Sequence, residues 1–322
     1  MTCGILLLDK PLGLSSSGAT QRVRRLLRLE KAGHVGSLDP LATGMLPICL
    51  GEATKLAGEV LEGAKTYAFR IALGFRTATG DTEGEVVESR PVPELPLTSI
   101  TDVLRRFVGH SLQIPPMYSA LKRDGRPLYA LARAGITVER AARPIRIESL
   151  GLLDVGDHWI DCRVVCGKGT YVRTLAEDVA GALGTCGHVA RLRREAVEPF
   201  DSADMLTLAG LEAICAAGRP LRLIPADRAV GHLPAVLLDE GTARRIGMGQ
   251  TVVLPPPELP EVASIQPVDY VGSSPAASDL TVRLYGPGPV FLGLGGVAPG
   301  GRVRPKRLFA AAASSPPGVA GE

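Results

Sequence analysis

The sequence predicts an α+β fold over its first two thirds and a small β-rich part over its last third. The chain of 322 residues is long enough for one large domain and a small one. Up to about residue 225, strand-sized apolar runs are mixed with stretches of helical periodicity. Beyond Leu233 the pattern changes to short apolar runs separated by glycines and prolines, which is typical of a small barrel or sandwich.

The first elements are a strand and a helix. Gly4–Leu8 is predicted to form a short buried strand that stops at an Asp-Lys-Pro turn. The serines at 15–17 then offer N-caps for a helix that runs to about Leu29, with apolar residues inward and arginines outward. Residues 33–51 contain two prolines, four glycines and a single charged residue, Asp39. This composition predicts an ordered loop against the core, where functional residues tend to lie.

The remaining elements follow from the same patterns. Lys65–Leu73 alternates like a strand, and 85–90 is expected to be its hairpin partner. Residues 115–135 mix prolines, basic residues and two tyrosines, which predicts a protruding segment. Further strands are expected at 145–155, 159–166, 188–197, 251–254, 280–285 and 290–294, and helices at 97–108 and 171–183. A long variable loop is expected at 255–278 and a disordered tail at 310–322, which gives a catalytic domain over 1–230 and a second domain over 231–309.

Composition disfavours membrane-spanning, secreted and zinc-binding proteins. No apolar run approaches the roughly 20 residues that span a bilayer, and the N-terminus lacks a signal peptide. Six scattered cysteines and five histidines lack metal-ligand spacing, so we expect free thiols, no metal and a cytoplasmic location.

Basic residues are clustered although the net charge is only +3. The clusters lie at 22–31, 122–146, 191–194 and 302–307. They could line one groove and neutralise the phosphates of a folded RNA. Solvated surface faces explain them equally well, and charge alone does not decide between the two.

Three segments contain residues that could together form a catalytic site. Asp39 stands in a glycine-rich loop between leucine and proline, where a carboxylate in a dry site needs a partner. Arg173 follows a Gly-Lys-Gly-Thr loop at the start of a helix and could keep that carboxylate ionised. Tyr67 presents an aromatic face on a strand. Each has a simpler interpretation alone: a turn-forming Asp before Pro, a surface phosphate contact, and a half-buried sheet residue.

The segment His34–Gly44, continued by Leu46–Lys55, resembles the catalytic segment of the TruB family of tRNA pseudouridine synthases. Asp9-Lys10-Pro11 with Ser15-Ser16, Lys65-Thr66-Tyr67, Met117–Lys122 and Lys168–Arg173 match the same family in the same order. The resemblance is strong over residues 3–200. Gly167 stands where the family has serine, and the C-terminal part matches weakly.

The resemblance implies the pseudouridine synthase fold: a mixed, largely antiparallel central sheet with flanking helices, and a C-terminal β-barrel-like domain of the PUA type. By position it makes Asp39 the nucleophile and Arg173 its partner. Tyr67 would stack on the flipped uridine, Tyr171 and Leu192 would complete the pocket, and His34 would hold the loop. Lys10, Lys55 and Lys122 would contact the RNA or support the active-site loop, and Lys122 would lie in an RNA-clamping insertion at about 110–145.

The implied substrate is the uridine at position 55 in the T-arm of tRNA, without cofactor, metal, guide RNA or obligatory protein partner, by a monomer. Two other readings stay open: an RNA-binding folding factor with little catalysis, and an enzyme of the same fold that acts on other RNA. A metal-dependent nuclease is disfavoured, because no carboxylate cluster accompanies Asp39 in the sequence.

Overall fold

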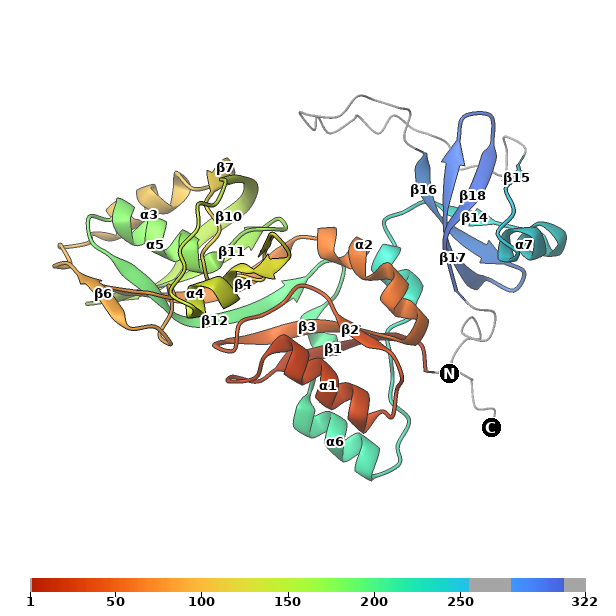
Figure 1. The fold of residues 1–322 in the computed structure, drawn as a ribbon, viewed down its shortest axis with the longest axis horizontal. Coiled ribbons are helices and arrows are strands. Elements are labelled where there is room, and N and C mark those ends of the chain that lie inside the picture. Colours follow the sequence, from red (N-terminus) through yellow and green to blue (C-terminus); the bar gives the residue numbers. More distant parts are fainter. Residues whose placement is uncertain (1, 255–278, 310–322) are drawn as a thin grey trace.

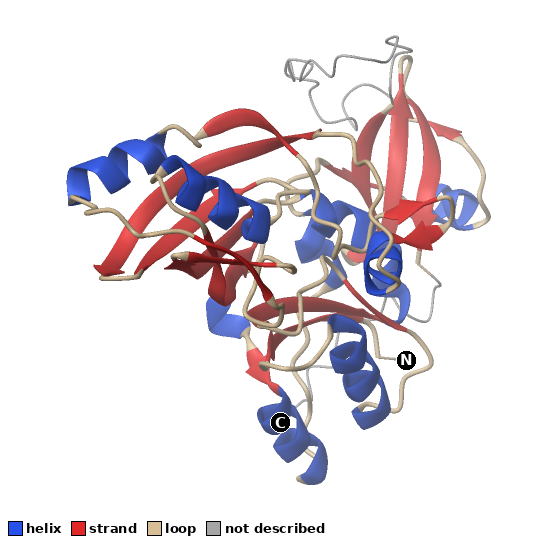
Figure 2. Cartoon of the chain, turned by 60° about the vertical axis from the view of Figure 1, so that its left-hand side comes forward, coloured by secondary structure: helices blue, strands red, loops and turns tan. Residues whose placement is uncertain are grey.

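The computed structural model describes residues 2–254 and 279–309 (Figure 1). A nine-stranded sheet forms the centre of the large part, and a five-stranded sheet forms the C-terminal part. The loop expected at 255–278 and the tail expected at 310–322 lie outside the described residues. In Figure 2 the helices of the large part lie beside its strands, and the C-terminal strands form a body of their own.

The large sheet is mixed and mostly antiparallel, as expected. Its strands run in the order β13-β1-β3-β12-β4-β11-β10-β7, with β2 paired to β3. Only β1–β13 and β3–β12 are parallel among these pairs. The bounds are β1 Gly4–Lys10, β2 Ala32–His34, β3 Ala42–Leu50, β4 Lys65–Leu73, β7 Gly109–Gln113, β10 Arg143–Gly156, β11 Trp159–Cys166, β12 Gly187–Val197 and β13 Leu206–Thr207.

Helices cover one face of this sheet with a continuous apolar core. The packing helices are α1 Ser16–Leu26, α3 Leu97–Arg105, α5 Val172–Ala182 and α6 Leu208–Ala216. Their buried residues form one cluster with the inward residues of β1, β3, β4, β11 and β12. A second cluster on the other face joins β1 and β3 to η1 Gly51–Leu56, α2 Ala57–Glu62 and η3 Ala226–Val230.

Most expected elements are confirmed with small changes of bounds. β4 and β11 have the expected limits, and Ser15 caps α1 by accepting from the amide of Gly18. The helix ends at Leu26 rather than Leu29, and Arg28 two residues later takes a left-handed conformation with φ 51°.

Two expectations about local structure are wrong. Residues 42–50 were expected in a loop but form β3, a central strand; only 35–41 lack regular structure between β2 and β3. Glycine and proline content predicts a loop, whereas pairing to β1 on one side and to β12 and β2 on the other imposes the strand. The strand β6 (Val86–Ser89) pairs with β5 (Phe75–Thr77) and not with β4, because the chain turns at Gly74, where φ is 96°.

The insertion near residue 120 contains a short hairpin and a helix. β8 (Lys122–Arg123) pairs with β9 (Arg126–Pro127), and α4 (Leu128–Arg133) follows directly.

The C-terminal sheet has the order β14-β16-β17-β18-β15, with one parallel pair, β14–β16. The bounds are β14 Ala235–Leu237, α7 Glu240–Gly247, β15 Val252–Val253, β16 Leu280–Gly286, β17 Val290–Ala298 and β18 Arg302–Leu308. The basic cluster at 302–307 is therefore part of a strand. Leu294 and Phe309 of this part belong to the second core cluster, so the two parts share an apolar contact.

Candidate active site

Asp39 lies on the loop 35–41, which several side chains hold by its backbone. Buried Ser16 donates its hydroxyl to the carbonyl of Leu38 at 2.9 Å and accepts from the amide of Leu38 at 2.7 Å. Lys10 is fully buried and donates to the carbonyls of Leu14 at 2.6 Å and Pro40 at 3.4 Å. The residues on both sides of Asp39 are thus tied to β1 and α1, which limits the directions its carboxylate can take.

His34 braces the same loop from the end of β2. One ring nitrogen lies 3.1 Å from the hydroxyl of Thr20, and the other lies 3.2 Å from the hydroxyl of Ser37. Burial, and to a lesser extent the charge of Arg194, lowers the pKa of His34, which favours the neutral ring. This geometry agrees with the loop-holding role that the resemblance implies.

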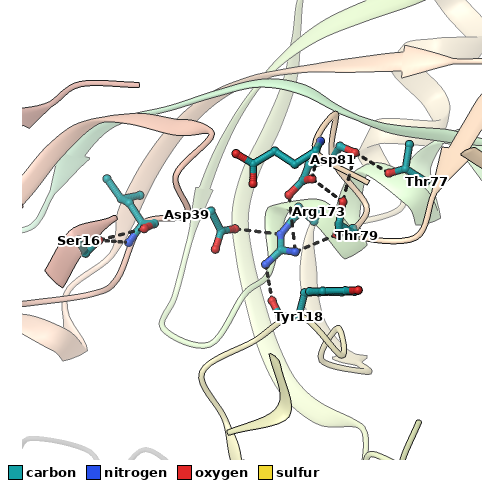
Figure 3. A network of polar contacts seen from close by, with 9 residues as sticks. Ser16, Asp39, Thr77, Thr79, Asp81, Tyr118 and Arg173 are labelled. Atoms are coloured by element: carbon teal, nitrogen blue, oxygen red, sulfur yellow. Dashed lines mark hydrogen bonds and ion pairs between the residues drawn. The ribbon is translucent and has the colours of Figure 1, made fainter. Parts of the chain in front are cut away.

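Arg173 pairs with Asp39 from the first turn of α5 (Figure 3). Its Nε lies 2.9 Å from Oδ2 of Asp39. Its two terminal nitrogens donate to the carbonyls of Thr79 at 2.8 Å and Tyr118 at 2.7 Å. Since the planar guanidinium is fixed on three sides, it can orient the carboxylate rather than follow it.

A second carboxylate, Asp81, lies behind Arg173 and was not singled out in the sequence. Its Oδ2 is 3.8 Å from Nη1 of Arg173, and it is almost completely buried. Its Oδ1 accepts from the hydroxyl of Thr79 at 2.5 Å and from the amide of Glu83 at 3.1 Å. It belongs to an irregular turn between β5 and β6, so no periodic pattern marks it in the sequence.

These contacts set the charge state of Asp39. Burial raises its pKa, the charge of Arg173 opposes that rise, and the charge of Asp81 adds to it. Burial likewise lowers the pKa of Lys10 to about 8, while the nearby Asp39 acts in the opposite direction. The carboxylate at the centre of the site therefore depends on its cationic neighbours to stay ionised.

Two tyrosines and a leucine are the expected residues of the base pocket. Tyr67 lies on β4 directly opposite Arg194, and Leu192 lies on β12 opposite Ala42, three residues after Asp39. Tyr171 precedes α5, with its amide and carbonyl bonded to the side chain of Gln113 at 2.8 and 3.1 Å. The structure thus brings the expected base-pocket residues to the neighbourhood of Asp39.

Lys55 and Lys122 lie elsewhere. Lys55 donates to Glu52 at 2.5 Å and to the carbonyl of Leu308 at 2.6 Å, which links η1 to the C-terminal part. Lys122 is exposed on β8 and borders a basic hollow of 380 Å³ with Arg123, Arg140 and Arg143. Their role as RNA contacts stays a prediction.

An ionised carboxylate held by a buried arginine beside aromatic rings is suited to attack on a planar base or its sugar. In the described residues no group of three metal-ligating side chains comes together. None of the helices in the described ranges is long and apolar enough to cross a membrane.

Comparison with known proteins identifies the family of this chain. Residues 24–172 match the model for the N-terminal domain of TruB family pseudouridylate synthases. Residues 173–230 match a tRNA pseudouridylate synthase B C-terminal domain, and 234–309 match a C-terminal domain of pseudouridine synthase II TruB. A tRNA pseudouridine synthase B of Aromatoleum aromaticum is 46% identical over 312 residues, which cover 97% of this chain and 94% of the relative. The chain belongs to the TruB family.

Other relatives and solved structures extend the likeness. A tRNA pseudouridine synthase B of Burkholderia pseudomallei is 49% identical over 251 residues, or 78% of this TruB-family chain and 83% of the relative. A structure of an H/ACA RNP bound to a substrate RNA containing 2′-deoxyuridine aligns with TM-score 0.69 at 21% identity, covering 97% of this chain and 87% of that one. An archaeal box H/ACA sRNP Nop10–Cbf5 complex aligns with TM-score 0.65 at 23% identity, covering 91% and 78%. These structures confirm the pseudouridine synthase fold.

Proposed function

We propose that this TruB-family protein isomerises uridine to pseudouridine at position 55 in the T-loop of tRNA. The observation that carries the proposal is the 2.9 Å contact between Arg173 and Asp39, made by a loop whose sequence resembles the family's catalytic segment. Relatives that share 46–49% identity over most of the chain are named tRNA pseudouridine synthase B, which supports the same substrate class.

The reaction breaks the N1–C1′ bond of the nucleotide, rotates the freed base and forms a C5–C1′ bond. The proton on C5 is lost and N1 gains one, so there is no net oxidation or reduction. Asp39 is the proposed nucleophile. Attack at C1′, addition to C6 and removal of a sugar proton all need an ionised carboxylate beside the base, which Arg173 supports.

The target base must first leave its stack, at a cost of a few kcal/mol. Stacking on Tyr67 offsets part of this cost, since base–aromatic stacking contributes about 1–3 kcal/mol. Tyr171 and Leu192 would close the pocket around the detached base. Phosphate contacts from the basic hollow near Lys122 would add to binding.

In this proposal residues 1–230 form the catalytic domain, with the RNA-clamping insertion at about 110–145. Residues 231–309 form a second domain that contributes to tRNA binding. We propose that the enzyme acts as a monomer in the cytoplasm on the T-arm of tRNA, without a guide RNA or a protein partner.

Tritium release from tRNA labelled at uracil C5 tests the proposal, with the wild type and Asp39→Asn compared in the presence of EDTA. Release by the wild type alone, mapped to the T-loop uridine, is the expected result. Tight tRNA binding without release would favour an RNA-binding folding factor with little catalysis. Release from labelled ribosomal RNA fragments but not from tRNA would favour an enzyme of the same fold that acts on other RNA.

A further inference from the structure

Arg194 is the largest of the fully buried side chains in the described part of the chain, with 1% of its surface exposed. It lies on β12 directly opposite Gly44 of β3 and Tyr67 of β4, and Gly44 in turn lies opposite Lys10 of β1. Four adjacent strands thus contribute the row Lys10, Gly44, Arg194 and Tyr67 on the helix-covered face of the sheet. This row runs beneath the loop that carries Asp39.

The guanidinium of Arg194 holds both ends of that loop, and Arg194 is the cross-strand neighbour of Tyr67. Its Nε donates to the carbonyl of Met45 at 2.7 Å, and its Nη2 donates to the carbonyl of Gly36 at 2.8 Å. Tyr67 lies directly opposite Arg194 on β4; burial raises the pKa of its phenol, and the interaction with Arg194 opposes that rise. Gly36 precedes Asp39 and Met45 follows it, so one rigid group sets the span of the loop and its distance from the ring.

A charge in this position is costly for stability. Among the residues that the structure describes, no carboxylate lies within ion-pair distance of Arg194. A hydrophobic side chain of similar size would fill the same space without the desolvation cost. The donors of the guanidinium, rather than its bulk, therefore account for its place in the site.

The fit around Arg194 leaves little room for adjustment. A Cβ on Gly44 would lie 2.2 Å from the backbone oxygen of Arg194, and φ of Gly44 is 97°. A Cβ on Gly36 would lie 3.1 Å from Nη1 of Arg194. Because both glycines allow direct contact of the loop with β12, a shift of the guanidinium would pass directly to the loop. Burial lowers the pKa of Lys10 and of His34 and raises that of Tyr67, and the charge of Arg194 acts to lower the pKa of all three.

We infer that Arg194 is a positioning residue for the isomerisation, which holds the Asp39 loop and the Tyr67 phenol in fixed register without itself contacting the RNA. The inference rests on the proposed function for its kinetic consequence. Its structural content, the link between loop and ring, can be tested separately.

The test compares Arg194→Lys, Tyr67→Phe and the double variant with the wild type. A lysine keeps the charge but has no planar fork with which to hold the carbonyls of Met45 and Gly36 at the same time. Arg163→Lys is the matched control, because Arg163 lies on β11 on the opposite face of the sheet and pairs with Glu195. Single-turnover tritium release, tRNA affinity and thermal melting are measured for each protein.

We expect Arg194→Lys to lose about 100-fold in single-turnover rate while its tRNA affinity changes less than about threefold, since misplacement by about 1 Å has costs of this size. The double variant should lose no more than the more impaired single variant. A rate within about threefold of the wild type, an equal loss of affinity, or additive losses would each overturn the inference. If neither Arg194→Lys nor Arg194→Gln folds, Arg194 is a purely structural residue and the inference is equally overturned.

Nuclear magnetic resonance of the protein with ¹³C-labelled tyrosine tests the contact without relying on activity. The Tyr67 resonance, assigned by its absence in Tyr67→Phe, should move in Arg194→Lys and stay in place in Arg163→Lys. An unmoved resonance overturns the inference. A wild type that releases no tritium refutes the proposed function alone, because the resonance still decides whether Arg194 holds the ring.

Discussion

The Nε atom of Arg173 lies 2.9 Å from Oδ2 of Asp39, and only 7% of the arginine side chain is exposed against 41% of the aspartate. The cation of this pair is therefore held inside the protein, while part of the anion is accessible at the surface. A buried, hydrogen-bonded arginine loses little freedom on pairing, so it can keep the carboxylate oriented before RNA arrives.

Asp39→Asn should abolish turnover and leave tRNA binding nearly unchanged. The amide keeps the size of the side chain but cannot act as an anionic nucleophile. Tritium release and filter binding measure the two effects. Turnover above background, once deamidation back to Asp has been excluded by mass spectrometry, would contradict the assignment.

Arg173→Ala should lower the single-turnover rate by about 100-fold or more, with a much smaller effect on tRNA affinity, because the carboxylate loses its orienting partner. Arg173→Lys should be impaired too, since it keeps the charge but loses the fork that holds Thr79 and Tyr118. Equal losses of rate and affinity would instead indicate a phosphate contact.

The acid limb of the pH–rate profile should report the ionisation of Asp39. Because burial raises its pKa, the rate should begin to fall at a higher pH than for an exposed aspartate. Asp81→Asn removes a negative charge that raises this pKa, so the acid limb should move to lower pH. Asp102→Asn, at an exposed position of α3, is the control and should not move it. A shift of the limb to higher pH in Asp81→Asn would refute the electrostatic role.

Ser16→Ala should destabilise the protein by about 1–3 kcal/mol and reduce the rate, because the buried amide and carbonyl of Leu38 both lose a partner. The neighbouring Ser17 is exposed, so Ser17→Ala should change stability by no more than about 0.5 kcal/mol. Denaturant unfolding and tritium release measure the two properties. Equal behaviour of the variants would show that Ser16 does not hold the loop.

Phe309→Ala should destabilise the large part of the protein as well as the C-terminal part. Phe309 is buried in the cluster that contains Ile5, Met45 and Val230, and it packs edge-on against Phe291 at 5.1 Å between ring centroids. Loss of such a ring costs about 3–5 kcal/mol. Thermal melting followed by circular dichroism should show one transition at a lower temperature. Val253→Ala, at a position 67% exposed, should have no comparable effect.

Local patterns predicted the elements whose sequence period matches their final environment. The alternation in Lys65–Leu73 and Trp159–Cys166 predicted strands with the observed bounds, since one face of each is buried. The glycines and prolines of 42–50 predicted a loop, and the structure shows a strand. The strand has no alternation of apolar and polar residues, because both faces of β3 are buried, one in each core cluster.

The sequence by itself determined which residues we propose as the centre of the site: Asp39, Tyr67 and Arg173 stand in motifs with characteristic order and local context. Only the tertiary structure decided which groups support them. Asp81 and Arg194 come from a turn and a strand that are distant in sequence from Asp39, and neither stands in a motif of its own. Their proposed roles rest on burial, strand register and distances of 2.7–3.8 Å, which depend on how the whole sheet assembles.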